Sequence, residues 1–223
     1  MKVPAYLALS LFTLTTLPAR ADIALNWLSN GYIDNAGHTV GTADSPLSAN
    51  LQPAARFTSL KTGLVSQIDL AVWYLPDIVT DPRVTVSLWT DSGFGPGTLL
   101  GSWDYSSTLT SVNCCNFDSI QTPNGPLLQK GQSYVLGVNG RGAFMGGWAW
   151  TNFQTSVYRK FNNGSWQFLS NTAPAARIYV TPTAAVPEPS SVCVLASMAG
   201  FALFFRRRVR IDGTPERKEP TRV

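Results

Sequence analysis

The sequence predicts an all-β fold, an antiparallel β-sandwich, and two observations lead to this prediction. The chain between Asp22 and Val186 has few Lys and no Glu, while aromatic and β-branched residues are common, a composition that favours strands over helices. Short runs of alternating apolar and polar residues also recur there, separated by turns rich in Gly, Asn and Pro. Short strands joined by tight turns are typical of sandwiches.

The alternation of apolar and polar residues predicts where each strand lies in the sequence. In the stretch 64–74, Ile68, Leu70, Val72 and Tyr74 share one face, as expected of a half-buried strand. The same alternation directs Val84, Val86 and Leu88 inward in the stretch 83–90, and it gives Tyr134, Leu136 and Val138 one shared face in the stretch 133–138. The residues from 22 to 54 instead carry turn signals such as Asn30-Gly31, and we expect a loop there. The predicted strands are 55–58, 64–74, 83–90, 98–103, 133–138, 147–150, 156–161, 165–168 and 176–180.

Two turns are the clearest local signals. The glycine-rich stretch 91–97 reverses the chain between two strands, and Asn163-Gly164 predicts a hairpin turn. The domain formed by residues 22–180 is therefore expected to be jelly-roll-like. Residues 181–185, rich in Thr and Ala, are expected to be a linker.

The N-terminal residues 1–21 predict a secretory signal peptide. Lys2 supplies a basic start, the residues from Val3 to Leu17 are mostly apolar, and Ala19 and Ala21 form a small-x-small cleavage site. We expect export by the Sec machinery and cleavage by signal peptidase before Asp22.

The C-terminal region predicts a membrane segment. Residues 192–205 carry no charge, and a helix over 190–205 would be about 24 Å long, a marginal length for a bilayer core of about 30 Å. A basic cluster follows and predicts a stop to transfer, with residues 211–223 in the cytoplasm. The cluster consists of Arg206, Arg207, Arg208 and Arg210.

Residues 186–210 resemble a PEP-CTERM sorting signal. The resemblance rests on the order of three parts: Val186, Pro187, Glu188 and Pro189, then the apolar run, then the Arg cluster. It implies that an exosortase in the inner membrane of a Gram-negative bacterium cuts near Pro187-Glu188-Pro189 and passes the protein to the cell surface or an extracellular matrix such as a biofilm. The tail after Arg210 is longer than in most such signals. An ordinary membrane anchor is the alternative.

The exported part resembles the choice-of-anchor extracellular domains of the R type over about residues 51–180. The residues that carry this resemblance are 84–93 and 96–100, with 55–58 upstream and 128–134 downstream. The resemblance brings no catalytic residues with it. It implies a domain that occurs together with interchangeable surface-anchoring signals.

Charge argues against a nucleic-acid partner. The chain has a formal net charge of +4, but residues 22–186 contain eight Lys and Arg against nine Asp, so the excess lies in the two targeting ends. The exported part therefore has no basic patch with which to neutralise phosphates.

No cofactor or metal is predicted. Cys114 and Cys115 are adjacent, and either a vicinal disulfide or two free thiols fits an exported protein. His38 is the only histidine, is expected in a loop, and makes no zinc-binding spacing with the cysteines.

The aspartates give weak support to a catalytic or calcium-binding role. No Gly-x-Ser-x-Gly motif accompanies His38, and a glycosidase pair would have to consist of two Asp, because Glu is absent. The candidates by residue type are Asp69, Asp77, Asp81, Asp91, Asp104 and Asp118. Several lie in turns, where Asp has a structural role, so a calcium loop at 77–81 or 91–93 is less expected than a plain turn. We expect no enzyme; a cryptic hydrolase is the third hypothesis.

Trp148 and Trp150 are two residues apart, so in a strand they project from one face. If exposed, this pair would stack on sugar rings, with hydrogen bonds from Asn152, Arg159 or Asn162. Burial in the core is the competing interpretation. We therefore expect an exported protein with a non-catalytic structural or adhesive role, and an exopolysaccharide-binding module as the alternative.

Overall fold

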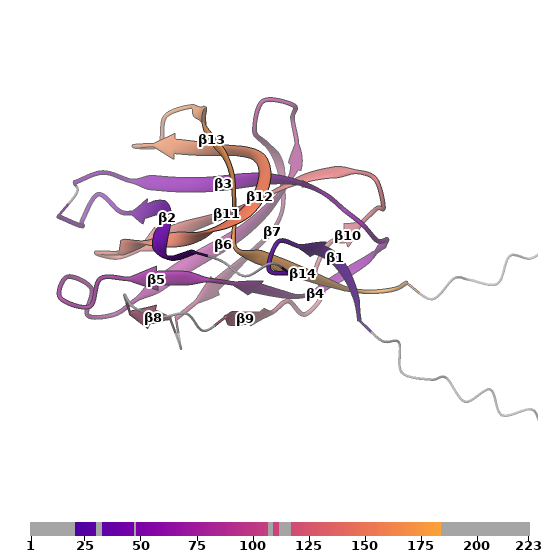
Figure 1. The fold of residues 1–223 in the computed structure, drawn as a ribbon, viewed down its shortest axis with the longest axis horizontal. Coiled ribbons are helices and arrows are strands. Elements are labelled where there is room, and N and C mark those ends of the chain that lie inside the picture. Colours follow the sequence, from indigo (N-terminus) through magenta and orange to yellow (C-terminus); the bar gives the residue numbers. More distant parts are fainter. Residues whose placement is uncertain (1–20, 30–32, 47, 107–108, 112–116, 184–223) are drawn as a thin grey trace, which may run out of the picture. The chain divides into compact units, whose positions relative to one another are not determined.

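The structure is a computed structural model of the 223-residue chain, and it describes residues 21–29, 33–46, 48–106, 109–111 and 117–183. The regular elements of these residues are strands, which form two sheets (Figure 1). Their pairings are antiparallel except for the short β5–β8 pair. The all-β, sandwich-like prediction is confirmed at this level. Ala19, Cys114, Cys115 and residues 184–223, which include the sorting signal, lie outside the described residues.

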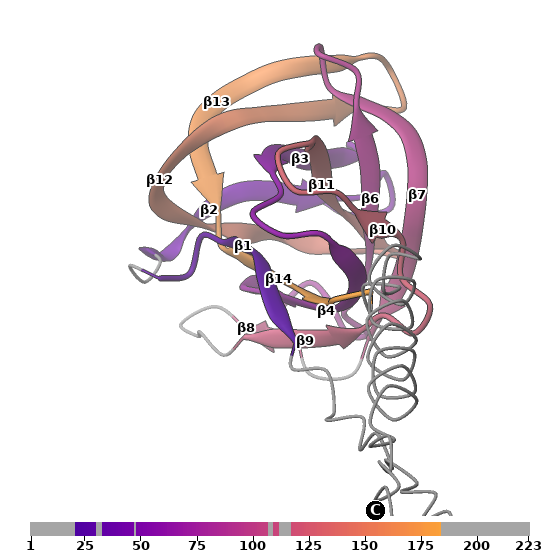
Figure 2. The same cartoon turned by 90° about the vertical axis from the view of Figure 1, so that its right-hand side faces the viewer.

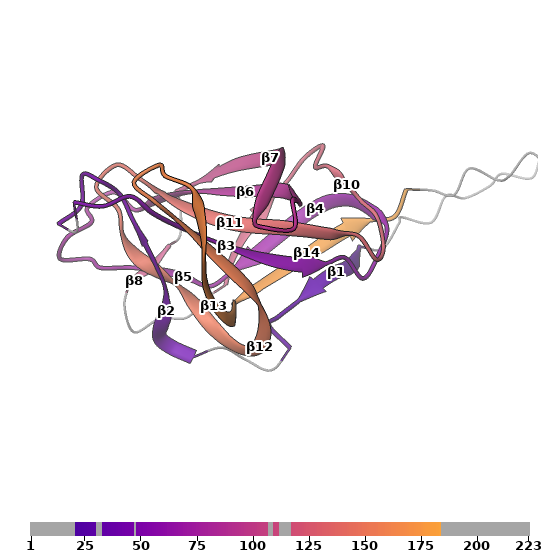
Figure 3. The same cartoon turned by 90° about the horizontal axis from the view of Figure 1, so that it is seen from above.

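The smaller sheet contains the first and the last strand. Its order is β1-β14-β4-β10, and β9 pairs with β4 beside β10. Asp22 of β1 pairs with Val180 of β14, so the two ends of the folded body lie side by side (Figure 3). The strands are β1 (Asp22–Asn26), β4 (Gly63–Leu70), β9 (Asp118–Gln121), β10 (Leu127–Leu128) and β14 (Ala176–Thr181).

The larger sheet has nine strands in the order β7-β6-β11-β3-β2-β12-β5-β8, with β13 paired to β12 and a further pairing between β3 and β12. Its strands are β2 (Ile33–Gly41), β3 (Leu51–Thr58), β5 (Val72–Tyr74), β6 (Arg83–Asp91), β7 (Pro96–Tyr105), β8 (Thr110–Ser111), β11 (Ser133–Arg141), β12 (Met145–Phe161) and β13 (Trp166–Pro174).

The core lies between the two sheets. Alternation sends Ile68 and Ile178 of the smaller sheet, and Val86, Leu88 and Leu136 of the larger one, into one buried cluster. These side chains are fully or almost fully buried. The inward face predicted for residues 83–90 is therefore confirmed.

Two strand predictions were wrong. Residues 22–54 are not a loop, because they contain β1, β2 and the start of β3. The predicted strand 64–74 is interrupted at Ala71, where the chain passes from the smaller sheet to the larger one. Hydrogen bonds connect Ala71 to Ala175 and Ala149 across the two sheets. Turn residues and the alternation of neighbouring apolar and polar residues carry no information about partners so far away in the sequence.

β12 is one strand of 17 residues, and it contains both of the predicted strands 147–150 and 156–161. Its first half pairs with β2 and β5, and its second half pairs with β3, so that the strand bends across the domain (Figure 3). The hairpin turn to β13 is present, but Asn162 and Asn163 are its central residues, with φ of 46° and 59°, and the Gly164 amide donates to the Phe161 carbonyl.

Among the described residues there is no helix whose length and apolar character would suit a membrane span. The helix predicted over 190–205 lies beyond them.

Candidate functional site

Trp148 cannot stack on a sugar, and for this residue the competing interpretation, burial in the core, is confirmed. Its side chain has no exposed surface, because it packs in the main core, and its Nε1 donates to the Ala175 carbonyl at 2.8 Å. Trp150 is partly exposed, with its ring 5.8 Å from the His38 ring. The two tryptophans therefore do not form an exposed pair.

His38 lies in β2 rather than in a loop, and it is 3% exposed. Its Nε2–H donates to the Thr172 carbonyl at 2.8 Å. Burial lowers the pKa of His38, because removal from water disfavours the imidazolium, and the bond to Thr172 opposes this shift. His38 is therefore a structural residue that is buried in its neutral form.

The pKa shift of His38 predicts acid sensitivity. Because the folded pKa lies below the unfolded value, the unfolded chain binds more protons below about pH 6.5, and the free energy of unfolding falls there by up to about 1.4 kcal/mol per pH unit. Above that pH the effect vanishes. His38→Gln, which keeps an N–H donor, should remove this part of the pH dependence. Urea denaturation between pH 5 and 8 measures it, and identical pH profiles for both proteins would contradict it.

Three of the candidate aspartates form ion pairs within the protein. Asp81, Asp91 and Asp104 form salt bridges with Arg83, Arg56 and Arg141. A hydrogen bond from the Thr85 hydroxyl, followed by the contact with Arg141, lowers the pKa of Asp104. These contacts account for the positions of the three carboxylates without a catalytic role.

Asp69 and Asp118 also have structural contacts, whereas Asp77 is exposed. Asp69, which is 6% exposed, accepts hydrogen bonds from Gln67 at 2.6 Å and Ser119 at 2.7 Å. Asp118 accepts one from the Tyr105 hydroxyl at 3.2 Å. No group of three or more His, Cys, Asp or Glu within the described ranges is placed to hold a metal ion.

A different set of aromatic side chains comes together on the outer face of the larger sheet. β6 and β13 are four strands apart in the order β6-β11-β3-β12-β13, about 19 Å in a flat sheet. The ring centroids of Trp89 on β6 and Trp166 on β13 are nevertheless only 6.0 Å apart, with the rings edge to face. The sheet therefore curls toward this side, as the arch of β12 and β13 shows (Figure 2).

Two glycines allow this approach. A Cβ at Gly137 would lie 2.9 Å from a ring atom of Trp89, so the indole rests against the strand backbone. Gly95, in the β6–β7 turn with φ of 136°, comes close enough to β13 that a Cβ there would lie 3.3 Å from the Cβ of Trp166. The tip of the β6–β7 hairpin thus touches β13.

A charged pair fixes the same hairpin. The Arg56 Nε and Nη2 lie 2.9 and 3.0 Å from the two carboxylate oxygens of Asp91, and Nη2 also donates to the Gly93 carbonyl at 2.6 Å. The guanidinium lies 5.9 Å from the centroid of the Tyr158 ring. This ion pair, in which Nη2 donates to both Asp91 and Gly93, joins β3 to the hairpin and neutralises both charges.

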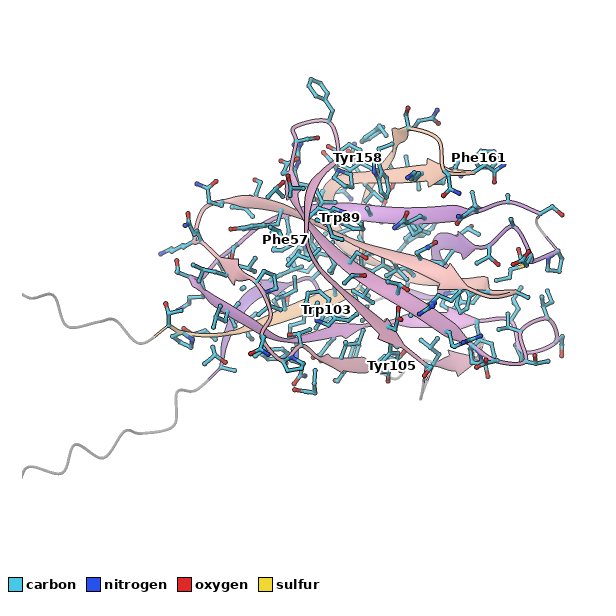
Figure 4. The ribbon with its side chains drawn as sticks, turned by 180° about the vertical axis from the view of Figure 1, so that it is seen from behind. Phe57, Trp89, Trp103, Tyr105, Tyr158 and Phe161 are labelled. Atoms are coloured by element: carbon cyan, nitrogen blue, oxygen red, sulfur yellow. The ribbon has the colours of Figure 1, made fainter. Side chains whose placement is uncertain are left out.

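We call the surface formed by Arg56, Trp89, Tyr158 and Trp166 the aromatic face. Tyr158 is almost buried, whereas both tryptophans are partly exposed. Figure 4 shows Trp89 and Tyr158 on the side of the domain where β6 turns into β7, with Tyr105 at the opposite end of β7.

Exposed apolar side chains adjoin the aromatic face. Phe94 precedes Gly95 and is 89% exposed, Leu99 pairs with Trp89 and is 53% exposed, and Phe168 pairs with Tyr158 and is 61% exposed. Isolated apolar residues are normal on a surface, but a group around two partly exposed tryptophans is typical of an interaction site. The sequence prediction missed this site; the alternation that sent Leu88 inward already implied that Trp89 points outward.

Two cavities also lie on the domain, and the lining of the smaller one includes Arg56 of the aromatic face. One of about 330 Å³ is lined by Trp27, Phe57 and Phe153 among others, and one of about 420 Å³ by Leu64, Val65 and Thr181 among others. Neither lining contains an Asp, His or Cys. Their residues therefore offer no acid–base or nucleophilic pair.

No family model, curated protein or solved structure matches this chain. The candidate site therefore rests on the residues of this chain alone.

Proposed function

We propose that this protein is exported from a Gram-negative cell, processed by an exosortase, and retained at the cell surface or in an extracellular matrix, where it binds without catalysis. The proposal includes the signal peptide at 1–21, the membrane helix at 190–205 and the sorting signal at 186–210. It also includes jelly-roll-like connectivity for the sandwich.

The order of parts at the C-terminus carries the proposal. A Pro-Glu-Pro motif at 187–189, an uncharged run at 192–205 and an Arg cluster from Arg206 follow one another, with only Ser190 and Ser191 between the motif and the run. An apolar helix with a basic cluster behind it stops transfer and keeps its basic end in the cytoplasm. The motif is then presented on the outer side, where an enzyme that processes exported proteins acts.

The limits of the folded body are compatible with this arrangement. β1 begins at Asp22, the residue after the predicted signal peptidase site, and β14 ends at Thr181, at the start of the predicted linker. Removal of both terminal segments therefore takes away none of the described strands. The aromatic face remains intact in the processed protein and supplies a surface for binding.

The double variant Pro187→Ala/Glu188→Ala is expected to abolish processing. Wild-type cells should yield a protein that ends near Pro187, and the variant should accumulate as the longer precursor in the membrane fraction. Intact-mass spectrometry of protein recovered from the cells, with and without the exosortase, measures the C-terminus directly.

The matched control is Thr183→Ala, which alters the linker but leaves β14 and the motif unchanged and should be processed normally. A full-length C-terminus in wild-type cells, unchanged by loss of the exosortase, would contradict the proposal. In that case the tail would be an ordinary membrane anchor.

A further inference from the structure

We propose that one end of the domain docks on an anionic phospholipid membrane before the tail is cut. This end consists of the turns 59–62 and 129–132, the pair of strands β4 and β10 between them, and the residues at which β1 begins and β14 ends. We call it the anchor end. The inference rests on the proposed function, because it takes the membrane helix at 190–205 from there.

The parts of the anchor end lie side by side. The Gly131 amide donates to the Ser59 carbonyl at 2.8 Å, so the two turns are in contact. Thr181, the last residue of β14, pairs with Leu64 of β4, shortly after the first turn. Figure 3 shows β10, the start of β1 and the end of β14 at the same end of the domain.

Three leucines are exposed at the anchor end. Leu60 belongs to the first turn, and Leu64 and Leu127 pair with each other across β4 and β10. Leu64 also lines the cavity of about 420 Å³, together with Pro123 and Thr181. Apolar side chains of this kind gain free energy when they enter the boundary between the headgroups and the acyl chains of a bilayer.

The charge of the anchor end is positive, although the exported part as a whole is nearly balanced. Lys61 and Lys130 are both exposed there, and they are two of the three lysines between residues 22 and 186. Asp22 opposes them, with its carboxylate 3.5 Å from the Lys61 Nζ. Cleavage of the signal peptide before Asp22 would add an α-amino group, so that three cations would stand against one carboxylate. Cations beside exposed leucines suit anionic headgroups above acyl chains.

A short connection to the membrane makes a weak docking surface sufficient. Residues 182–189 separate β14 from the predicted helix at 190–205, and a chain of that length spans at most about 29 Å. A tether of this length gives an effective concentration on the order of millimolar. The anchor end contains Thr181, where the connection begins, so it is the part of the domain that the tether brings to the membrane.

Photo-crosslinking of the full-length protein, reconstituted in vesicles, tests the proposal. p-Benzoylphenylalanine takes the place of Leu64 in one variant and of Leu127 in another, and intact mass detects a lipid adduct after illumination. Both variants should form lipid adducts in phosphatidylglycerol vesicles. Lys61→Gln/Lys130→Gln should lower the yield at least about fivefold, the factor expected from one lysine at an anionic surface.

The matched control is p-benzoylphenylalanine in place of Phe168. Phe168 is also apolar and exposed, but it lies on β13 beside the aromatic face, and it should form no lipid adduct. Phosphatidylcholine vesicles are the second control, in which the yield at Leu64 and Leu127 should fall as it does in the lysine variant.

Three outcomes would overturn the docking surface: adducts at Phe168 as frequent as at Leu64, equal yields in the two kinds of vesicle, or adducts between two protein chains in place of lipid. Flotation with the vesicles reports insertion of the tail separately. A protein that floats without lipid adducts at Leu64 and Leu127 would reject docking and keep the membrane helix, and a protein that does not float would reject both. Lipid adducts in a protein that cells do not process would keep docking and reject exosortase sorting.

Discussion

Replacement of Trp148 by Ala is expected to lower the free energy of unfolding by about 3–5 kcal/mol. Trp148 is among the largest fully buried side chains of the domain, and it lies in the cluster between the two sheets. Its loss would leave a cavity that neighbours in regular strands cannot fill. The Ala175 carbonyl would also lose its indole donor.

Urea denaturation followed by fluorescence or circular dichroism measures this loss. Trp148→Phe should be less costly, because it keeps most of the packing and loses the hydrogen bond. Phe168→Ala is the surface control and should change stability by less than about 0.5 kcal/mol, since its side chain is 61% exposed. A Trp148→Ala protein as stable as the control would show that the indole is not buried in solution.

Replacement of Gly146 by Ala is expected to destabilise the protein by about 3 kcal/mol, at the upper end of the cost of overpacking. Gly146 lies in β12 between Val40 of β2 and Tyr74 of β5. A Cβ there would be 2.0 Å from the backbone carbonyl oxygen of Trp73. A backbone atom cannot move aside as a side chain can, so β5 would have to separate from β12.

Thermal unfolding of Gly146→Ala beside Gly131→Ala measures this cost. Gly131 has φ of 82° and open space around its Cβ position, so alanine there costs only backbone strain, about 1 kcal/mol. Equal melting temperatures for the two variants would contradict the expected steric clash.

The parts of the fold that were predictable depend on neighbours in sequence. Alternation identified the inward faces of β6 and β11, because side chains on a strand alternate between its two sides. β1 and β2 were missed because their pairing with β14 and β12 is decided by residues more than a hundred positions away, and their Gly and Asn residues resemble a loop. The passage of the chain from the smaller sheet to the larger one at Ala71 was missed for the same reason, because Ala71 is hydrogen-bonded to the distant Ala149 and Ala175.

The candidate site was less predictable than the fold. Trp148 and Trp89 both follow simple alternation, but burial depends on which face another sheet covers. The contact between Trp89 and Trp166 arises from the curl of the sheet and from Gly95 and Gly137, whose role is clear only once the strands are paired. The spacing of Trp148 and Trp150 in the sequence therefore did not indicate where partly exposed tryptophans come together, which is at Trp89 and Trp166.

The position of β14 has a mechanical consequence. β14 is the last strand before the tail, and it is hydrogen-bonded along both edges, to β1 on one side and to β4 on the other. A pulling force on the tail reaches the domain through this strand. To extract it, the force must break two ladders and remove Ile178 and Val180 from the core. A domain anchored through its C-terminus therefore bears the force on an interior strand, which resists extraction more than an edge strand with a single ladder would.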